Sequence, residues 1–269
     1  MKRRWAGIGS RIGWRRPVLL ILCLILVALF LYDWRHSRPD NDGTWARVQQ
    51  TGILRIGMDA SYPPFSDTPG GVPVGLDVDI ANEIGRRLHL RIDIANMGFD
   101  SLYDALQTGQ VDALISALSI DPVQMSRVIY TTGYIDAGQV IVSRDGQLGR
   151  MEDLEGRTLA VEYGSLGDET ARIWQRRLHL LNLKHFTAAN DAMQAVIEGR
   201  ADAALVDFVT ARLVVRGHPG LVINPNPVTH DTYAAAVRLA SYDLGGAISD
   251  ALKAMTGDGT LAAILDRWL

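Results

Sequence analysis

Residues 104–117 read DALQTGQVDALISA, and residues 194–207 read QAVIEGRADAALVD. Each segment has an amphipathic stretch, a glycine, two further residues, an Asp-Ala pair and a short apolar run. The first part is typical of a helix that ends at glycine, and the last part is typical of a buried strand. The repeated spacing therefore predicts two similarly built lobes. The alternative is that helix–strand corners of this kind simply look alike.

From residue 52 onward, short β-branched runs alternate with amphipathic runs, which is typical of an α/β protein. Strands are predicted over residues 53–58, 92–94, 113–116, 139–143, 158–162, 184–186, 203–206, 221–224 and 233–238. Helices are predicted over residues 77–88, 100–107, 168–180, 191–198 and 208–216, and two more close the chain. Ligands bind beyond the carboxyl ends of strands in open α/β sheets, so the residues after each strand are the candidates for a site.

The chain opens with a basic segment that leads into an apolar one. Residues 1–32 hold six Lys or Arg and no acid, and residues 18–32 are 15 consecutive apolar positions. This order is typical of membrane targeting and would send the rest of the chain outward. An uncleaved anchor is favoured over a cleaved signal peptide, because no small-x-small cleavage pattern follows; a buried core helix is the remaining alternative. The polar residues 35–50 are predicted to form a tether.

Composition and charge exclude several classes of protein. The chain has 269 residues and a net charge of -3, and residues 33–269 alone carry -9. An acidic body repels phosphate backbones, so no nucleic-acid partner is expected. The single cysteine, Cys23, excludes a disulfide framework and CxxC sites. The six histidines show no metal-like pairing, so neither a metal nor another cofactor is expected.

Several spaced motifs resemble family 3 of the bacterial extracytoplasmic solute-binding proteins, the polar amino-acid receptors of ABC importers. In family order they are LRIGMDASYPPFSD, VGLDVDIANEIGRRL, QTGQVDALISALSI, DLEGRTLAVEYGS, EGRADAALVD and GDGTLAAILDRWL. The resemblance covers nearly all of residues 51–269. It implies a two-lobed, periplasmic-binding-protein-like (type II) α/β fold with a central cleft that closes by hinge motion. The fold would follow the targeting segment, residues 1–34.

The implied lobes are discontinuous in the sequence. Lobe 1 would comprise residues 51–135 and 233–269, and lobe 2 residues 136–232. The hinges would lie near residues 135–139 and 228–233. The last segment of the chain would therefore return to the lobe in which the first strands lie.

The resemblance places part of a ligand site in lobe 1. Asp59 and Tyr62 match the family's first cleft loop, where an aromatic ring stacks on the ligand. Phe99 matches a second apolar wall. Ser116 and Ser119 match positions that bind ligand groups through hydroxyl and backbone. Packing in a rigid loop, with no ligand contact, is the alternative for Tyr62.

The remaining implied site residues lie in lobe 2 and after the serine corner. Ser165 matches a hydroxyl position, and Asp207 matches the acid that pairs with a ligand ammonium, a strong bond in a water-poor cleft. Capping of the following helix is the alternative for Asp207. The family's arginine that grips a ligand carboxylate is replaced here by Gln124, and a family threonine by Leu166. Arg127 is the candidate substitute for that arginine, and a cationic or amine ligand is favoured.

Four further acids are predicted to be structural. Asp77 and Asp79, at the start of a predicted helix, are expected to cap it or to shape the turn before it. Asp112 and Asp202 precede their strands, away from the carboxyl ends, and are expected to hold the corners. None of the four is expected to contact a ligand.

The resemblance implies an extracytoplasmic monomer that presents a small polar solute, an amino acid or a related amine, to an ABC permease. It would be anchored by its N-terminal helix or secreted after cleavage.

No HExxH, P-loop or nucleophile-elbow motif occurs, so an enzyme is not expected. Two alternatives stay open. One is a dehydratase of the same fold, in which Asp207 or Glu162 would act as general acid on a cyclic acid. The other is a sensing module with a separate partner.

Overall fold

A computed structural model describes residues 25–27 and 42–269 of the chain. Residues 25–27 are helical. Within these described ranges, no helix is long and apolar enough to cross a membrane. The apolar run predicted to target the membrane, residues 18–32, lies outside the described residues except for 25–27, so membrane targeting stays a prediction.

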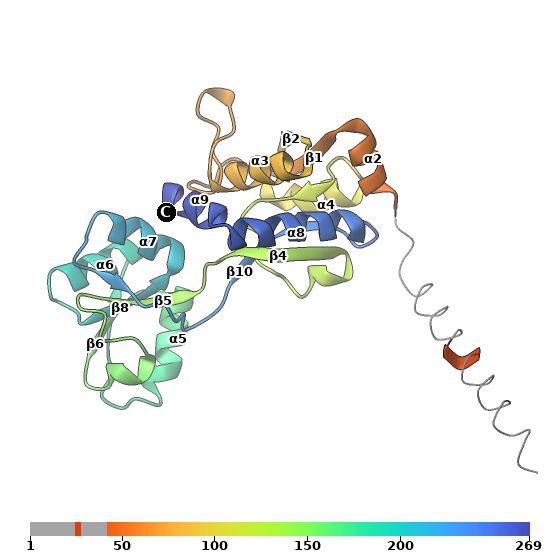
Figure 1. The fold of residues 1–269 in the computed structure, drawn as a ribbon. Helices are drawn as coiled ribbons and strands as arrows, with labels where there is room; N and C mark the ends of the chain where they lie inside the picture. Colours follow the sequence, from red (N-terminus) through yellow and green to blue (C-terminus); the bar gives the residue numbers. More distant parts are fainter. Residues whose placement is uncertain (1–24, 28–41) are drawn as a thin grey trace, which may run out of the picture. The chain divides into compact units, whose positions relative to one another are not determined.

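The first sheet has five strands in the order β2-β1-β3-β10-β4 (Figure 1). Its parallel strands are β1 (Ile53–Met58), β2 (Arg91–Asn96) and β3 (Ala113–Leu114). Strand β10 (Thr232–Arg238) is antiparallel both to β3 and to β4 (Val128–Asp136). The last strand of the chain therefore returns to the sheet that the first strands build.

Strand β4 is the one strand of this sheet that the sequence does not predict. Its residues read VIYTTGYID, and the buried positions are 128, 131, 134 and 135. This spacing matches neither the alternation of a half-buried strand nor a continuous buried run. Pairing with β10, which is interrupted by register shifts, produces the irregular pattern.

Five helices pack on the first sheet or on one another: α2 (Thr44–Thr51), α3 (Leu76–Leu88), α4 (Leu102–Gln107), α8 (Tyr242–Gly257) and α9 (Thr260–Trp268). Helix α2 corrects the prediction that residues 35–50 form only a tether. Its Trp45 and Val48 lie one turn apart and pack on the core of this part of the chain, and Val48 is fully buried. Two apolar residues are too few to show a helical period in the sequence, which is why α2 is not predicted.

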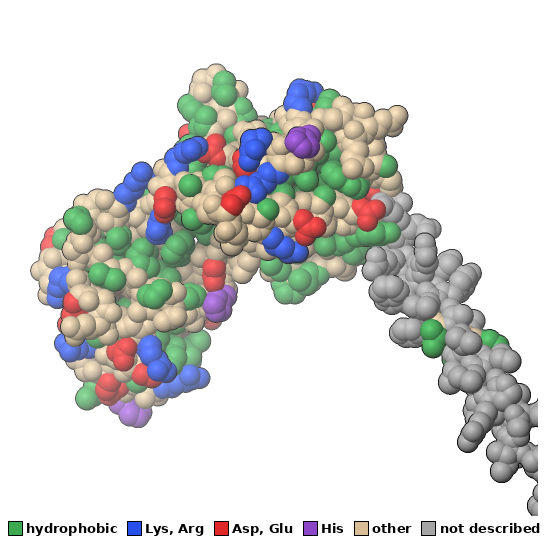
Figure 2. Space-filling view, viewed as in Figure 1, with side chains coloured by type: hydrophobic (Ala, Val, Ile, Leu, Met, Phe, Trp, Pro, Cys, Tyr) green, Lys and Arg blue, Asp and Glu red, His purple; other side chains and the backbone are tan. Residues whose placement is uncertain are grey.

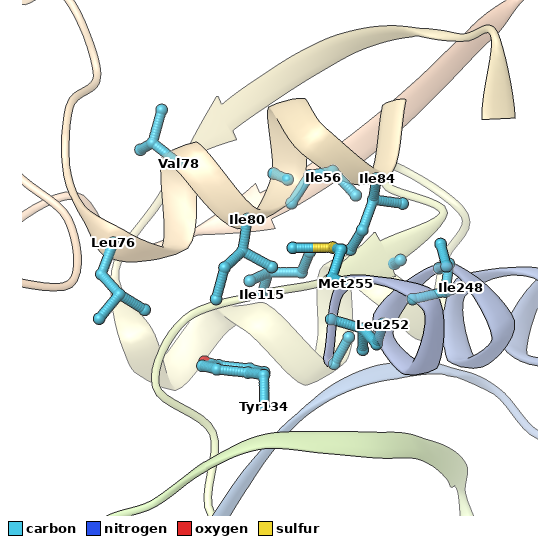
Figure 3. Packing of buried hydrophobic residues seen from close by; sticks show 14 of the residues in the cluster. Ile56, Leu76, Val78, Ile80, Ile84, Ile115, Tyr134, Ile248, Leu252 and Met255 are labelled. Atoms are coloured by element: carbon cyan, nitrogen blue, oxygen red, sulfur yellow. The ribbon is translucent and has the colours of Figure 1, made fainter. Parts of the chain in front are cut away.

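The core of the first sheet confirms the apolar face predicted for α3. Figure 3 shows Ile80 and Ile84 of α3 lying with Ile56 of β1 and Met255 of α8, and all four side chains are fully buried. The i, i+4 spacing of the two isoleucines puts them on one face of the helix. Burial of a side chain of this size contributes about 2 kcal/mol to stability.

The second sheet has the strand order β7-β6-β8-β5-β9. Strand β6 (Thr158–Glu162) lies between β7 (Asn182–Phe186) and β8 (Ala203–Asp207), and the three are parallel. Strand β5 (Gln139–Ser143) is antiparallel to β8 and to β9 (Val222–Ile223). The two sheets thus share a plan of three parallel strands with antiparallel strands beside them.

Three α-helices accompany the second sheet: α5 (Leu166–Gln175), α6 (Ala189–Ile197) and α7 (Phe208–Arg216). The bounds of α7 match the prediction, whereas α5 ends earlier than the predicted residue 180. Short 3-10 helices are η1 (Pro69–Gly71), η2 (Phe99–Ser101), η3 (Gln124–Ser126) and η4 (Met151–Leu154).

The repeated sequence segments form the same corner in both sheets. In each, the helix ends at a glycine with φ 74°. Asp112 Oδ2 accepts a hydrogen bond from Arg55 N of β1 at 3.1 Å, and Asp202 Oδ2 accepts one from Thr158 N of β6 at 2.8 Å. Asp112 also binds the side chains of Arg47 and Arg55. The structural roles predicted for both aspartates are therefore confirmed.

Candidate functional site

Two neighbouring cavities share Tyr62 and Tyr233 in their walls. The large pocket, of about 410 Å³, is lined by residues 62–65 from the connection after β1 and by Asp231 before β10, together with Leu166, Asp207 and further residues of the second sheet and its helices. The small pocket, of about 310 Å³, is lined by connections of the first sheet. Both volumes suit a small molecule.

The structure brings five of the nine predicted site residues to these pockets. Tyr62 and Asp207 line the large pocket. Asp59, Phe99 and Ser116 line the small pocket together with Tyr62. All five follow or lie between strands, so the rule that ligands gather beyond carboxyl ends of strands groups them as expected.

The predicted residues Ser119 and Ser165 line neither pocket. Ser119 pairs as an isolated β-bridge with Tyr233, so it adjoins the pocket wall through the backbone. Ser165 is the N-cap of α5: its Oγ accepts a hydrogen bond from Asp168 N at 3.1 Å and donates one to Glu162 O at 2.8 Å. The hydroxyl of Ser165 is thus used within the helix end.

Gln124 and Arg127 also lie outside both pockets. Gln124 begins η3, and its Oε1 is buried. The Arg127 guanidinium pairs with Asp104, with 3.2 Å between Nη2 and Oδ1. Arg127, which is predicted to bind a ligand carboxylate in place of the family arginine, is therefore paired with a carboxylate of the protein.

Asp207 is the N-cap of α7 and lines the large pocket at the same time. Its Oδ1 accepts a hydrogen bond from Thr210 N at 2.8 Å. Oδ2 has no hydrogen-bond or ion-pair partner among the described residues. The structure shows the capping role, and because the cap uses only one carboxylate oxygen it does not exclude contact with a ligand.

Asp231 is a second carboxylate in the large pocket, and sequence reasoning missed it. Within the described part of the chain, its carboxylate has no hydrogen-bond or ion-pair partner, and only its backbone N–H donates, to Asp136 Oδ1 at 2.9 Å. Burial, followed by Asp207 and Asp231, raises the pKa of Tyr62. Burial and the same two carboxylates, among other groups, raise the pKa of Tyr233. Both tyrosine rings therefore lie in the field of the two carboxylates.

The charged side chains that line the two pockets differ in sign from the mixture on the surrounding surface. On the face shown in Figure 2, acidic and basic side chains of residues 43–269 are interspersed. The charged side chains among the described residues that line the two pockets are all aspartates. Within the described residues, no group of three or more His, Cys, Asp or Glu is placed to hold a metal ion.

Asp59 organises the wall of the small pocket. Its Oδ1 accepts hydrogen bonds from Ser61 N and Oγ, and its Oδ2 accepts one from Phe99 N at 3.0 Å. Its own N–H donates to Ser116 Oγ at 3.0 Å, which leaves the Ser116 hydroxyl proton to donate elsewhere. Asp59 thus joins the Tyr62 loop to Phe99, and its carboxylate is largely occupied.

Aromatic rings form the wall between the two pockets. Tyr62 stacks on Phe65 with ring centroids 5.5 Å apart and an interplanar angle of 6°. Phe65 also contacts Tyr233, at 5.5 Å and 58°. Phe65 is buried, whereas 55% of Tyr62 is exposed. The packing interpretation of Tyr62 therefore holds for one face of its ring, and the other face is open to a ligand.

The structure contradicts the capping role predicted for Asp77. Helix α3 is preceded by Gly75 and has no side-chain cap. Asp77 is fully buried, and its Oδ2 accepts a hydrogen bond from Ala117 N at 2.7 Å, where Ala117 has a φ of 46° and lines the small pocket. Asp77 Oδ1 and the Tyr134 hydroxyl are buried and have no hydrogen-bond partner among the described residues. The side chain points into the core because its neighbours on α3 are buried, and sequence spacing alone does not show its distant partner.

Asp79 does not cap α3 either. Its Oδ2 accepts hydrogen bonds from Trp268 Nε1 and from Arg267 Nη1, both at 2.8 Å. It therefore fastens the C-terminal helix α9 to α3. The predicted structural role is right, but the partner lies at the far end of the sequence.

Asp77 is expected to make stability fall as pH rises. Burial raises the pKa of Asp77 from 3.8 to about 7, and this effect outweighs the lowering of the pKa by the nearby Tyr134 hydroxyl and by the Ala117 N–H. Between those pH values the folded state holds a proton that the unfolded state has lost, so this group costs up to about 4 kcal/mol above pH 7. Asp77→Asn removes the cost. Urea unfolding should show the variant gaining stability relative to wild type between pH 4 and pH 8.

An exposed aspartate supplies the control for this pH experiment. Asp250→Asn should follow the wild-type dependence on pH, because Asp250 is exposed on α8. Parallel stability curves for wild type and Asp77→Asn across the same range would contradict the buried-acid account.

Comparison with known proteins gives a single family. The sequence profile of "Bacterial extracellular solute-binding proteins, family 3" matches residues 54–269, which span both sheets. The arginine-binding extracellular protein ArtP of Bacillus subtilis (strain 168) is 26% identical over 250 residues, covering 92% of this chain and 96% of the relative. The L-cystine-binding protein TcyJ of Escherichia coli (strain K12) is 25% identical over 233 residues, covering 85% of this chain and 86% of the relative.

A solved structure shares the fold as well as the sequence pattern. The structure of an ancestral cationic amino acid solute binding protein is 28% identical to this chain, with a TM-score of 0.62. The likeness covers 84% of this chain and 99% of that protein. The mixed α/β fold with two sheets is therefore shared with a protein whose whole length aligns.

Proposed function

The chain belongs to family 3 of the bacterial extracellular solute-binding proteins, and from this we propose that it is the binding protein of an ABC transporter. It captures a small polar solute, an amino acid or a related amine, between two lobes and presents it to a permease. The names of the relatives, which bind arginine, L-cystine or cationic amino acids, support this class of solute.

The large pocket carries this proposal. Residues from both sheets line it. Residues 62–65, from the connection after β1, and Tyr233 of β10 belong to the first sheet, and Leu166 and Asp207, at the starts of α5 and α7, belong to the second. We take the first sheet with its helices as lobe 1 and the second sheet with α5, α6 and α7 as lobe 2. A solute in this pocket touches both lobes, and contacts that are complete only when the lobes approach favour a closed state.

Two adjacent chain crossings connect the lobes. The crossings are residues 137–138, between β4 and β5, and residues 224–231, between β9 and β10. Ala137 N donates to Asp231 O at 2.7 Å, and Asp231 N donates to Asp136 Oδ1 at 2.9 Å. Two crossings that are hydrogen-bonded to each other support a hinge between the lobes. They lie close to residues 135–139 and 228–233, where the family resemblance implies the hinges.

The proposal includes the cellular setting. The protein acts outside the cytoplasm as a monomer, and the basic and apolar residues 1–34 anchor it to the cytoplasmic membrane or direct its secretion. The family description, extracellular, supports the location.

Binding without catalysis is the function that the pocket supports. Glu162, one candidate general acid of a dehydratase, does not line either pocket. Asp207, the other candidate, is the N-cap of α7, and its Oδ1 accepts a hydrogen bond from Thr210 N. The named relatives are binding proteins.

A thermal-shift screen tests the proposed function. The full chain is heated with amino acids, amines, carboxylates and cyclic acids, each at millimolar concentration. A ligand at 100 times its Kd adds about 2.7 kcal/mol of stability, which raises Tm by several degrees in a protein of this size. We expect amine-bearing compounds to raise Tm. If no compound of the panel does so, the solute-binding function is contradicted.

A further inference from the structure

We propose that the solute is a small organic cation without a carboxylate group, such as a short aliphatic diamine or an aminoalkylguanidine. This inference rests on the proposed function and narrows its solute class. The relatives named above bind amino acids, which carry both an ammonium and a carboxylate. The charged side chains among the described residues that line the two pockets of this chain are aspartates. They can pair with a ligand ammonium but not with a ligand carboxylate.

Two carboxylates in the large pocket lack a counter-ion. Asp207 Oδ2 and both oxygens of Asp231 have no hydrogen-bond or ion-pair partner within the described residues. Half-buried carboxylates are costly when unpaired, so a cation that binds both would gain two charge-assisted hydrogen bonds. Two amine groups on one short chain provide that match.

Among residues 42–269, no basic side chain lines either pocket, where it could hold a ligand carboxylate. Among the described residues that line them, none is Lys, Arg or His. Arg127, the predicted substitute, pairs with Asp104. A carboxylate on the solute would therefore face Asp207 and Asp231 with no compensating positive charge.

One N–H group at each helix N-terminus beside the large pocket is already paired with a side chain of the protein. The N–H groups at a helix start bind anions when they are free. At α7, Thr210 N donates to Asp207. At α5, Asp168 N donates to Ser165 Oγ, and the Asp168 carboxylate accepts from Gly164 N at 3.0 Å. Two carboxylates of the protein, those of Asp207 and Asp168, thus already lie at these helix starts and would repel a ligand carboxylate placed beside them.

The aromatic wall favours a cation as well. Tyr62 exposes one ring face, and Tyr233 lines both pockets beside it. The negative face of an aromatic ring attracts an ammonium or guanidinium group. The burial of both tyrosines near Asp207 and Asp231, which raises the pKa of each, keeps their rings neutral at ordinary pH.

Three pairs of compounds test this inference on the full chain by calorimetry: ornithine with putrescine, lysine with cadaverine, and arginine with agmatine. Within each pair, the two molecules share the distal cationic group and differ by the α-carboxylate. We expect the member without a carboxylate to bind about tenfold or more tightly in every pair that binds, because like charges facing each other oppose binding.

The outcomes separate this inference from the proposed function. Tighter or equal binding of the amino acids would overturn the carboxylate-free solute and leave a solute-binding protein. No binding by any of the six, together with a negative thermal-shift screen, would overturn both. Leu166→Arg supplies a further arm: a guanidinium in the large pocket should reduce the preference for the amine, and an unchanged preference would also count against the inference.

Discussion

Replacing Asp207 by asparagine is expected to lower the affinity for the solute about 100-fold while leaving the unfolding transition nearly unchanged. Asparagine caps helices as well as aspartate does, so its Oδ1 should keep the hydrogen bond from Thr210 N. The substitution removes the negative charge from the large pocket. A charge-assisted bond in a water-poor cleft contributes about 2 to 5 kcal/mol, which corresponds to a loss of this size. Calorimetry measures the affinity.

A matched substitution controls for the change in net charge. Asp250→Asn removes one negative charge from an exposed position of α8, where Asp250 pairs with Lys253. It should bind the solute as wild type does. Wild-type affinity in Asp207→Asn, with an intact fold, would remove Asp207 from the site.

Gly138→Ala is expected to destabilise the protein by about 3 kcal/mol. A Cβ at this position would lie 1.8 Å from Thr229 O and 2.6 Å from Thr229 C, atoms of the other chain crossing. These are backbone atoms, so rotation of a side chain cannot relieve the clash, and the crossings must separate. The Gly138 carbonyl also accepts a hydrogen bond from Phe208 N at 3.0 Å, which joins this crossing to the start of α7. The loss should lower Tm by roughly 10 °C.

The same substitution at Gly246 should have the opposite sign. Gly246 lies in α8 with no atom within 4 Å of the added Cβ. Alanine favours a helix interior by about 0.5 to 1 kcal/mol over glycine. Similar unfolding midpoints for the Gly138 and Gly246 variants would show that the crossings are not packed as closely as described.

Local patterns predict most of the fold. The two corners at residues 104–117 and 194–207 predict a repeated α/β unit, because a glycine with positive φ and a buried strand leave clear signals in sequence. Strand β4 and helix α2 are not predicted. Their burial depends on β10 and on the core of the first sheet, partners that lie far away in the sequence.

The residues of the candidate site likewise include some that the sequence predicts and others that it does not. The roles of Tyr62 and Asp207 are predicted from the family resemblance, and the rule that ligands bind at the carboxyl ends of strands agrees, because Tyr62 comes after β1 and Asp207 ends β8. Asp231 and Tyr233 are missed, because they reach the pocket only when β10 returns to the first sheet. Asp77 is placed wrongly for a similar reason, since its partner Ala117 is 40 residues away.

The measurement that tests the central claim most directly is the distance between the two lobes with and without solute. The chain has one cysteine, so spin labels at Asp93→Cys on β2 and Lys184→Cys on β7 can be introduced cleanly in a Cys23→Ser background. Both positions are exposed. A solute concentration that just saturates the wild-type protein should shorten the distance, and at the same concentration Asp207→Asn should show little change because it binds about 100-fold more weakly. An unchanged distance distribution in the presence of bound solute would contradict capture between the lobes.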